Sequence, residues 1–266
     1  MVNAEVFIEA IGLAAPGMPS WQQAARVLRG ELPYEPVALP LHSPALLPAN
    51  ERRRATPAVR LAFQAAEDAM LASTVPAASL ATVFASSDAD LNIIHRISSA
   101  LAATPRLISP TDFHNSVHNA AAGYWSIAVG SRAPSSTISA FDASFAVGLA
   151  EACGMVTVDR CDTLLVAFDL PPPEPLYAKR PIEAAVSVAV VLTCERTLNT
   201  LASMQWALTQ DTESTLKTAL LESLRLGNPA ARALPLLELL AQNRSDRIVL
   251  PQAEKNAGLA VELRML

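Results

Sequence analysis

A stretch rich in β-forming residues at 136–141 is followed almost at once by a helical stretch at 143–156, and this junction restricts the fold more than any other feature. Only Asp142 separates the two. A residue in that position lies at a helix N-terminus, where backbone N–H groups and the helix dipole favour negative charge. Nucleophile elbows use the same geometry. We therefore expect a layered α/β protein that presents the side chain of residue 142 at the end of a strand.

The rest of the chain alternates short apolar runs with helical stretches, as layered α/β proteins do. Before residue 195 we expect strands at 6–13, 81–86, 163–168 and 184–194, and helices at 20–28, 54–72, 91–101 and 117–129. After it we expect strands at 201–208, 247–250 and 259–263, and helices at 213–226 and 230–242. The pattern of predicted strands and helices changes after residue 195, so we expect two parts, 1–195 and 196–266, packed into one domain.

Composition excludes several classes of function. The chain has 266 residues, of which 51% are apolar, and 20 Lys+Arg against 25 Asp+Glu give a net charge of −5. A mildly acidic chain is not a general nucleic-acid binder. We expect no membrane span, because no run approaches the roughly 20 apolar residues that one requires. Secretory-signal features are also lacking, and three cysteines without CxxC spacing indicate reduced thiols, so we expect a cytoplasmic protein without a zinc site. Neither a dinucleotide fingerprint nor a phosphate loop occurs, and no cofactor is expected.

A long, ordered series of motifs occupies residues 108–170. It comprises I-S-P, V-x-N-A-A-A-G, R-x-P, a short strand, the junction at 142 and its helix, and C-D-x-x-L-V. This order resembles the N-terminal half of β-ketoacyl synthases of the thiolase fold. The resemblance extends back through Glu51–Arg54 to residues 8–12 and covers about three quarters of the chain. It implies a thiolase-like layered α/β fold with a complete, ketosynthase-like N-terminal half at 1–195 and a truncated C-terminal half at 196–266.

Two departures from that family bear on activity. Ketosynthases carry the acyl-accepting cysteine at the junction, where this chain has Asp142, and a carboxylate is a weak nucleophile toward thioesters. The family also takes two catalytic histidines from its C-terminal half. The four histidines here are His42, His95, His114 and His118, so none follows residue 118. We therefore expect a catalytically inactive ketosynthase homologue.

A ketosynthase-like chain without its cysteine resembles the chain length factors of type II polyketide systems, and this one most resembles the factor of bacterial aryl polyene pigment clusters. The resemblance implies a heterodimer with a catalytic ketosynthase, in which this subunit bounds the acyl tunnel and acyl carrier protein contacts the complex. Two alternatives remain open. One is a small hydrolase or thioesterase that uses Asp142 or Ser144 with His118. The other is a homodimeric scaffold that binds acyl carrier protein.

The same resemblance indicates site residues. The strand with Ser136, Thr137, Ile138 and Ser139 aligns with the family's interface strand, which pairs with the partner subunit. Phe113 aligns with a position that reaches into the partner's acyl pocket, where a rigid ring can act as the tunnel floor. The alternative is that Phe113 packs in its own core. Further candidates for tunnel or interface residues are Asp112, Ser116 and Val117, beside Phe113, and Phe141 and Phe145, near the junction.

Two other groups favour a structural interpretation. His114 and His118 are four residues apart, a spacing found in metal sites, but no third ligand is near in sequence and we expect them to pack at an interface or in the core. The run Arg52–Arg54 is interpreted as the solvated start of a helix. The alternative is that it attracts an acidic carrier protein.

Overall fold

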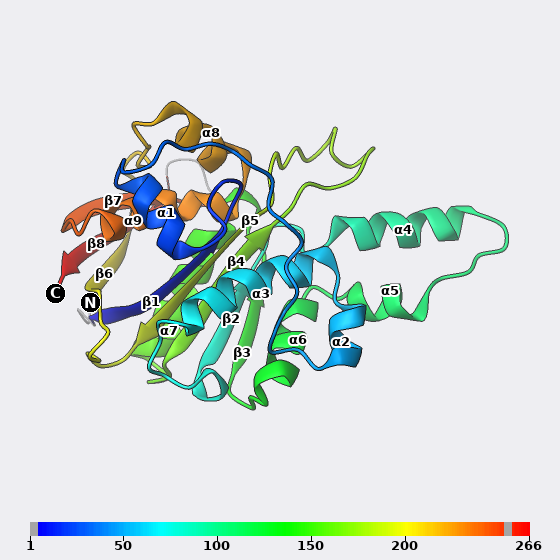
Figure 1. Ribbon diagram of the computed structural model, residues 1–266, viewed down its shortest axis with the longest axis horizontal. Coiled ribbons are helices and arrows are strands. Elements are labelled where there is room, and N and C mark those ends of the chain that lie inside the picture. Colours follow the sequence, from blue (N-terminus) through cyan, green and yellow to red (C-terminus); the bar gives the residue numbers. More distant parts are fainter. Residues whose placement is uncertain (1–4, 253–256) are drawn as a thin grey trace.

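The computed structural model describes residues 5–252 and 257–266, and within them eight strands form one mixed sheet (Figure 1). The strand order is β3-β2-β4-β5-β1-β6-β8-β7. The strands are β1 (Val6–Ala14), β2 (Ala81–Ala85), β3 (Ser135–Ile138), β4 (Thr163–Asp169), β5 (Val186–Thr193), β6 (Ala202–Thr209), β7 (Asp246–Pro251) and β8 (Gly258–Met265). The mixed α/β fold expected from the sequence is confirmed.

The helices follow the expected alternation. The α-helices are α1 (Trp21–Leu28), α2 (Ala49–Arg54), α3 (Pro57–Met70), α4 (Leu91–Ala102), α5 (Pro110–Asn115), α6 (Ala120–Val129), α7 (Ser144–Thr157), α8 (Ala219–Gly227) and α9 (Leu234–Ala241). Short 3-10 turns add η1 (Ala77–Ser79), η2 (Phe141–Ala143) and η3 (Ala230–Ala233). None of these helices combines the length and apolarity needed to cross a membrane.

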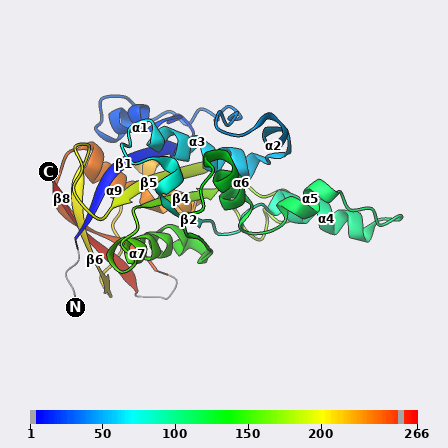
Figure 2. The same cartoon turned by 90° about the horizontal axis from the view of Figure 1, so that it is seen from below.

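Side chains alternate along the strands and build an apolar cluster on each face of the sheet. In β5, Val188 and Val190 belong to one cluster, while Ala189 and Val191 belong to the other. Helices α3 and α6 cover one face of the β2–β4 region and α7 covers the opposite face (Figure 2). This two-sided burial is why β4 and β5 read as continuous apolar runs.

Strands β3, β2 and β4 are parallel, and every other pairing in the sheet is antiparallel. The carboxyl ends of parallel strands meet at one edge, so the residues that follow these three strands lie together. Strand β3 is also the last strand on its side of the sheet, with β2 as its only neighbour.

The three late strands continue this sheet. β6 pairs with β1 over three residue pairs, from Val6–Met204 to Ile8–Ala202, and β8 and β7 follow in antiparallel order. The part of the chain after residue 195 therefore shares the sheet of the first part.

Helices α4 and α5 form an arm that projects from the body (Figure 1). Asp90 caps α4, and Ser109 caps α5 with Pro110 in its first turn. Arg96 and Asp112 hold the two helices together through a bond of 2.8 Å. The arm nevertheless exposes several large apolar side chains: Ile94, Leu101, Leu107, Ile108 and Phe113.

Several predicted boundaries were wrong. Helix α6 begins at Ala120 rather than at 117, and the helix expected over 230–242 starts as the turn η3 and becomes α9 only at Leu234. The strand expected to run to residue 141 ends at Ile138, and α7 begins only at Ser144, because Phe141 adopts a positive φ of 53° and opens the turn η2. The helix expected from residue 213 begins at Ala219, since Ser214 donates its backbone N–H to Val249 of β7 instead. The helix expected over 54–72 is α3, which begins only at Pro57 and ends at Met70, because Ala55 and Thr56 before the proline are extended and Arg54 is the last residue of the separate helix α2.

Candidate functional site

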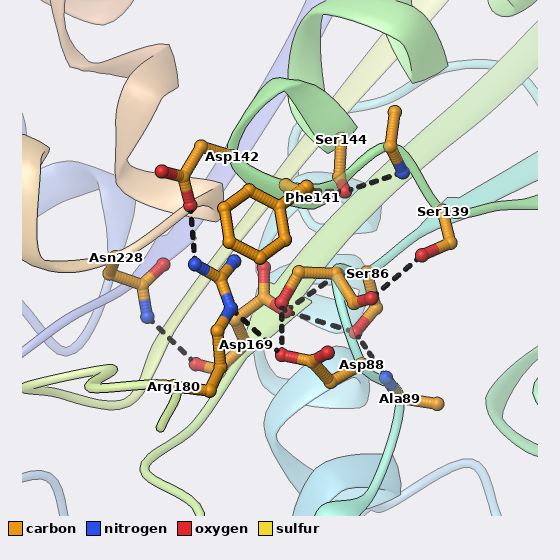
Figure 3. Close-up of polar contacts among 12 residues, drawn as sticks. Ser86, Asp88, Ala89, Ser139, Phe141, Asp142, Ser144, Asp169, Arg180 and Asn228 are labelled. Carbon is orange, nitrogen blue, oxygen red and sulfur yellow. Dashed lines mark hydrogen bonds and ion pairs between the residues drawn. The ribbon is translucent and has the colours of Figure 1, made fainter. Parts of the chain in front are cut away.

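The site lies at the carboxyl edge of the parallel strands and is dominated by one arginine. Arg180 comes from the loop 170–185 between β4 and β5 and reaches back over the junction after β3 (Figure 3). Its Nη1 lies 2.7 Å from Oδ1 of Asp142, and its Nε lies 3.2 Å from Oδ2 of Asp88. The guanidinium carbon sits 3.6 Å from the centre of the Phe141 ring, a cation–π contact. Arg180 thus ties the loop to the turn that carries Asp142.

A second arginine links Asp142 to the late part of the chain. Arg232 Nη2 lies 3.9 Å from the other carboxylate oxygen of Asp142, and its Nη1 lies 3.4 Å from Glu213. Glu213 also pairs with the fully buried Arg225 at 3.0 Å, and Arg225 pairs with Glu222 at 2.7 Å. Burial lowers the pKa of Arg232. Asp142 therefore lies within a chain of ion pairs that runs from Asp88 through Arg180 and on to α8.

The hydroxyl of Ser144 is used by the turn itself. Ser144 is buried, donates to the carbonyl of Phe141 at 2.7 Å and accepts from the N–H of Ala140 at 3.0 Å. In the described residues no histidine forms a hydrogen bond with Asp142 or Ser144. The general base that a hydrolase would require next to either side chain is not among their partners.

Behind the junction a buried carboxyl group connects the ends of β2 and β4. Asp169 accepts hydrogen bonds from the Ser86 hydroxyl and from the N–H and hydroxyl of Ser87, at 2.8 to 3.1 Å. Burial raises the pKa of Asp169 to about 7, against the lowering effect of these hydrogen bonds. Asn228 donates to the backbone carbonyls of Asp169 and Ala184 and joins the late part of the chain to this edge.

Arg180, Arg232, Asp169 and Asn228 were not anticipated from the sequence. Ser86 ends one predicted strand and Asp169 directly follows another, and the rule that parallel strands meet at their carboxyl ends was the signal that pointed to them. Nothing local marked Arg180, which lies 38 residues after Asp142 in a proline-rich loop.

The predicted interface strand lies at the open edge of the sheet as β3. Ser136 donates to Glu151 at 3.2 Å, Ser139 donates to the carbonyl of Ser87 at 2.7 Å, and Thr137 and Ile138 are half-buried. The carbonyls of Pro134 and Ile138 accept from β2. Because backbone groups alternate along a strand, those of Thr137 point to the open edge.

The arm carries the predicted tunnel residue. Phe113 is 68% exposed on α5, so it does not pack in this chain's core. Asp112, beside it, is bound by Arg96, which holds the pKa of that carboxyl below its usual range. The Ser116 hydroxyl donates to the Phe113 carbonyl at 2.8 Å, and Val117 is exposed.

The other two phenylalanine candidates differ in burial. Phe141 is 61% exposed under Arg180 and lies next to the edge strand. Phe145 is fully buried in the cluster on the α7 face of the sheet. Phe145 is therefore a core residue of this chain and does not line its surface.

The remaining candidates have local partners. The His114 ring packs edge-on against Tyr124, with centroids 6.1 Å apart, and His118 lies in the turn before α6. The described residues contain no group of three or more His, Cys, Asp or Glu side chains arranged to hold a metal ion. The interpretation of Arg52–Arg54 as a helix start was wrong, because these residues form the last turn of α2, and Arg52 donates to the carbonyls of Ala45 and Leu47 of the preceding loop.

A family model described as the N-terminal domain of β-ketoacyl synthases matches residues 20–253. The chain belongs to the β-ketoacyl synthase family. No curated protein sequence matches it. Its fold is that of the ketosynthase–chain length factor complex ApeO–ApeC from Xenorhabdus doucetiae, with 23% identity, a TM-score of 0.70, and coverage of 97% of this chain and 98% of that one.

Two further ketosynthase structures have the same fold at lower identity. The ishigamide ketosynthase/chain length factor is 12% identical with a TM-score of 0.73, over 98% of this chain and 99% of that one. The type II polyketide ketosynthase AntDE, solved with the acyl carrier protein AntF, is 12% identical with a TM-score of 0.74 and full coverage of both chains. The thiolase-like fold expected from the sequence is confirmed.

Proposed function

We propose that this chain is a non-catalytic chain length factor that forms a heterodimer with a ketosynthase and bounds its acyl tunnel, in aryl polyene or related type II polyketide synthesis. The main observation behind the proposal is which residue occupies position 142 and what that residue binds. Where the family presents its cysteine, this chain has a carboxylate that Arg180 holds at 2.7 Å. A carboxylate bound in this way attacks a thioester poorly.

The groups around residue 142 favour a structural role for this site and not a catalytic one. The Ser144 hydroxyl stabilises the turn, and Arg180 and Arg232 both form ion pairs with the carboxylate of Asp142. The partner ketosynthase then supplies the cysteine and the histidines of the reaction. Phe113, exposed on the arm, contributes the tunnel floor from this side.

Two surfaces support pairing with another subunit. Strand β3 has a free backbone edge and no lysine or proline to protect it, and unprotected edges of this kind bind further strands. The arm adds exposed apolar side chains that a partner would cover. The similar structure from Xenorhabdus doucetiae is itself described as a ketosynthase in complex with its chain length factor.

The test is co-expression with a candidate partner ketosynthase, purification through a tag on this chain alone, and native mass spectrometry. We expect a 1:1 heterodimer. Thr137→Pro should abolish it, because proline removes the N–H that faces the open edge while the bonds of Ile138 and Pro134 to β2 remain. The matched control is Thr137→Val, which keeps the N–H and changes only the side chain.

Other results would overturn the proposal. A homodimer that does not bind the ketosynthase would favour the scaffold interpretation. Condensation of acyl and malonyl thioesters by the isolated chain would contradict the absence of catalysis. A heterodimer that tolerates Thr137→Pro would show that β3 is not the pairing edge.

A further inference from the structure

Three polar atoms without partners meet at the base of the arm. Oδ2 of Asp90, Oδ1 of Asn115 and Nε2 of His118 are inaccessible to solvent and have no hydrogen-bond partner among the described residues. Asp90 and Asn115 are only 8% and 3% exposed. All three residues line the same small cavity. Buried polar atoms in native proteins are almost always satisfied by protein groups or ordered water, so three orphans around one cavity point to a ligand.

The orientations of the two oxygen atoms are fixed by other bonds. Oδ1 of Asp90 accepts from the N–H groups of Asn92 and Ile93 as the cap of α4, which leaves Oδ2 for the cavity. The Asn115 amide nitrogen donates to the carbonyls of Thr111 and Arg54, which leaves its oxygen for the cavity and for the neighbouring buried hydroxyl of Tyr124. Both oxygen atoms are hydrogen-bond acceptors, so the ligand must be a donor.

The size of the cavity limits the ligand to a very small molecule. The volume in which the centre of a water molecule can lie is about 10 Å³. One buried water needs roughly 10–15 Å³ of such volume. Most of the other lining residues are apolar and offer no further hydrogen bond: Ala58, Val59, Ala89, Val117, Ala120, Ala121 and Phe168. There is no room for an organic ligand.

We propose that this cavity binds one ordered water molecule, which donates to Asp90 Oδ2 and Asn115 Oδ1 and accepts from a protonated Nε2 of His118. Three partners are the usual number for a buried water. The water joins the first turn of α4, the last residue of α5 and the turn before α6, against the wall formed by α3. It is a cross-link at the base of the arm.

The cross-link fixes the direction in which the arm projects. Within the arm Arg96 binds Asp112, and the side chain of Asn115 also donates to the carbonyl of Arg54 in α2, so the water adds a second polar link between the arm and the body. If the chain is the chain length factor proposed above, the water also determines where Phe113 lies in the partner. The water itself does not depend on that function.

The first measurement is a high-resolution crystal structure of the full chain purified alone, which needs no ketosynthase. We expect one density peak within hydrogen-bond distance of the three atoms. An empty cavity would overturn the proposal. So would a cation, recognised by anomalous scattering after growth in rubidium, because the ligand would then not be water.

The second measurement is amide hydrogen exchange in variants. His118→Phe keeps an aromatic ring but removes Nε2, and Asp90→Ser keeps a capping oxygen but removes Oδ2. We expect exchange of arm amides in 91–115 to rise about tenfold in each, while β4 and β5 stay protected. The matched control is His95→Phe, on α4 but outside the cavity, which should change nothing. Unchanged exchange in both test variants would overturn the cross-link.

Discussion

The groups around Asp142 are all suited to a negative charge. Arg180 and Arg232 lie at 2.7 and 3.9 Å, and the first turn of α7 follows directly. Cationic neighbours and a helix N-terminus stabilise a thiolate as well as a carboxylate. We therefore predict that Asp142→Cys creates a reactive thiol. At pH 7, peptide-resolved mass spectrometry should find residue 142 alkylated by iodoacetamide at least about tenfold faster than Cys161 or Cys194.

The control for this prediction is the double variant Asp142→Cys with Arg180→Gln. Glutamine keeps a hydrogen-bonding side chain but removes the nearer charge, so alkylation should slow several-fold. Equal rates in the single and double variants would mean that Arg180 does not stabilise an anion at this position.

At the scale of elements, Asp169 connects the ends of β2 and β4 and makes stability depend on pH. Burial raises its pKa to about 7 from an ordinary value of 3.8, so the folded chain holds this proton to higher pH than the unfolded chain does. The resulting stability is fully present below about pH 3.8 and is lost as the pH rises through about 7. We predict that, from pH 5 to 8, the Tm of the wild type falls relative to that of Asp169→Asn.

Asparagine cannot ionise, yet its oxygen can still accept from Ser86 and Ser87, which is why it is the informative replacement. The exposed Asp159 offers the control, and the Tm of Asp159→Asn should run parallel to the wild type. Parallel curves for Asp169→Asn would contradict the prediction.

The sequence predicted best those elements whose apolar residues follow one clear pattern along the chain. β4 and β5 are buried on both faces and α1 is capped by Ser20, and each was located within about two residues. The end of β3 could not be predicted, since it depends on Phe141 at positive φ and on the bond between Ser144 and Ala140. Both features depend on how this turn packs in the folded chain.

The candidate site was predicted only in part for a similar reason. Asp142 was identified because the residues just before it predict a strand and the residues just after it predict a helix. Arg180 and Arg232 reach it from 38 and 90 residues away, and no local pattern distinguishes them from solvated arginines. Their role became visible only in the folded sheet, where β2 joins β3 to β4 and β5 follows.

At the scale of the whole molecule, the arm extends apolar side chains away from the body (Figure 1). Phe113 is the largest of them and is 68% exposed, although burying such a ring in its own core would be favourable. An exposed aromatic on a projecting arm is better explained by a partner than by this chain alone. This argument does not depend on the edge of β3, so the two surfaces can be tested separately.

The last prediction follows from that exposure. Under the proposed function, Phe113→Ala in the assembled complex should lengthen or broaden the product distribution, because removal of a rigid ring would deepen the tunnel that the proposal assigns it to close. Mass spectrometry of the extracted polyenes measures this directly. Leu198→Ala, at another exposed apolar residue far along the chain, should leave the products unchanged. If Phe113→Ala makes the same products while the heterodimer stays intact, the ring only contributes to binding and another group sets the chain length.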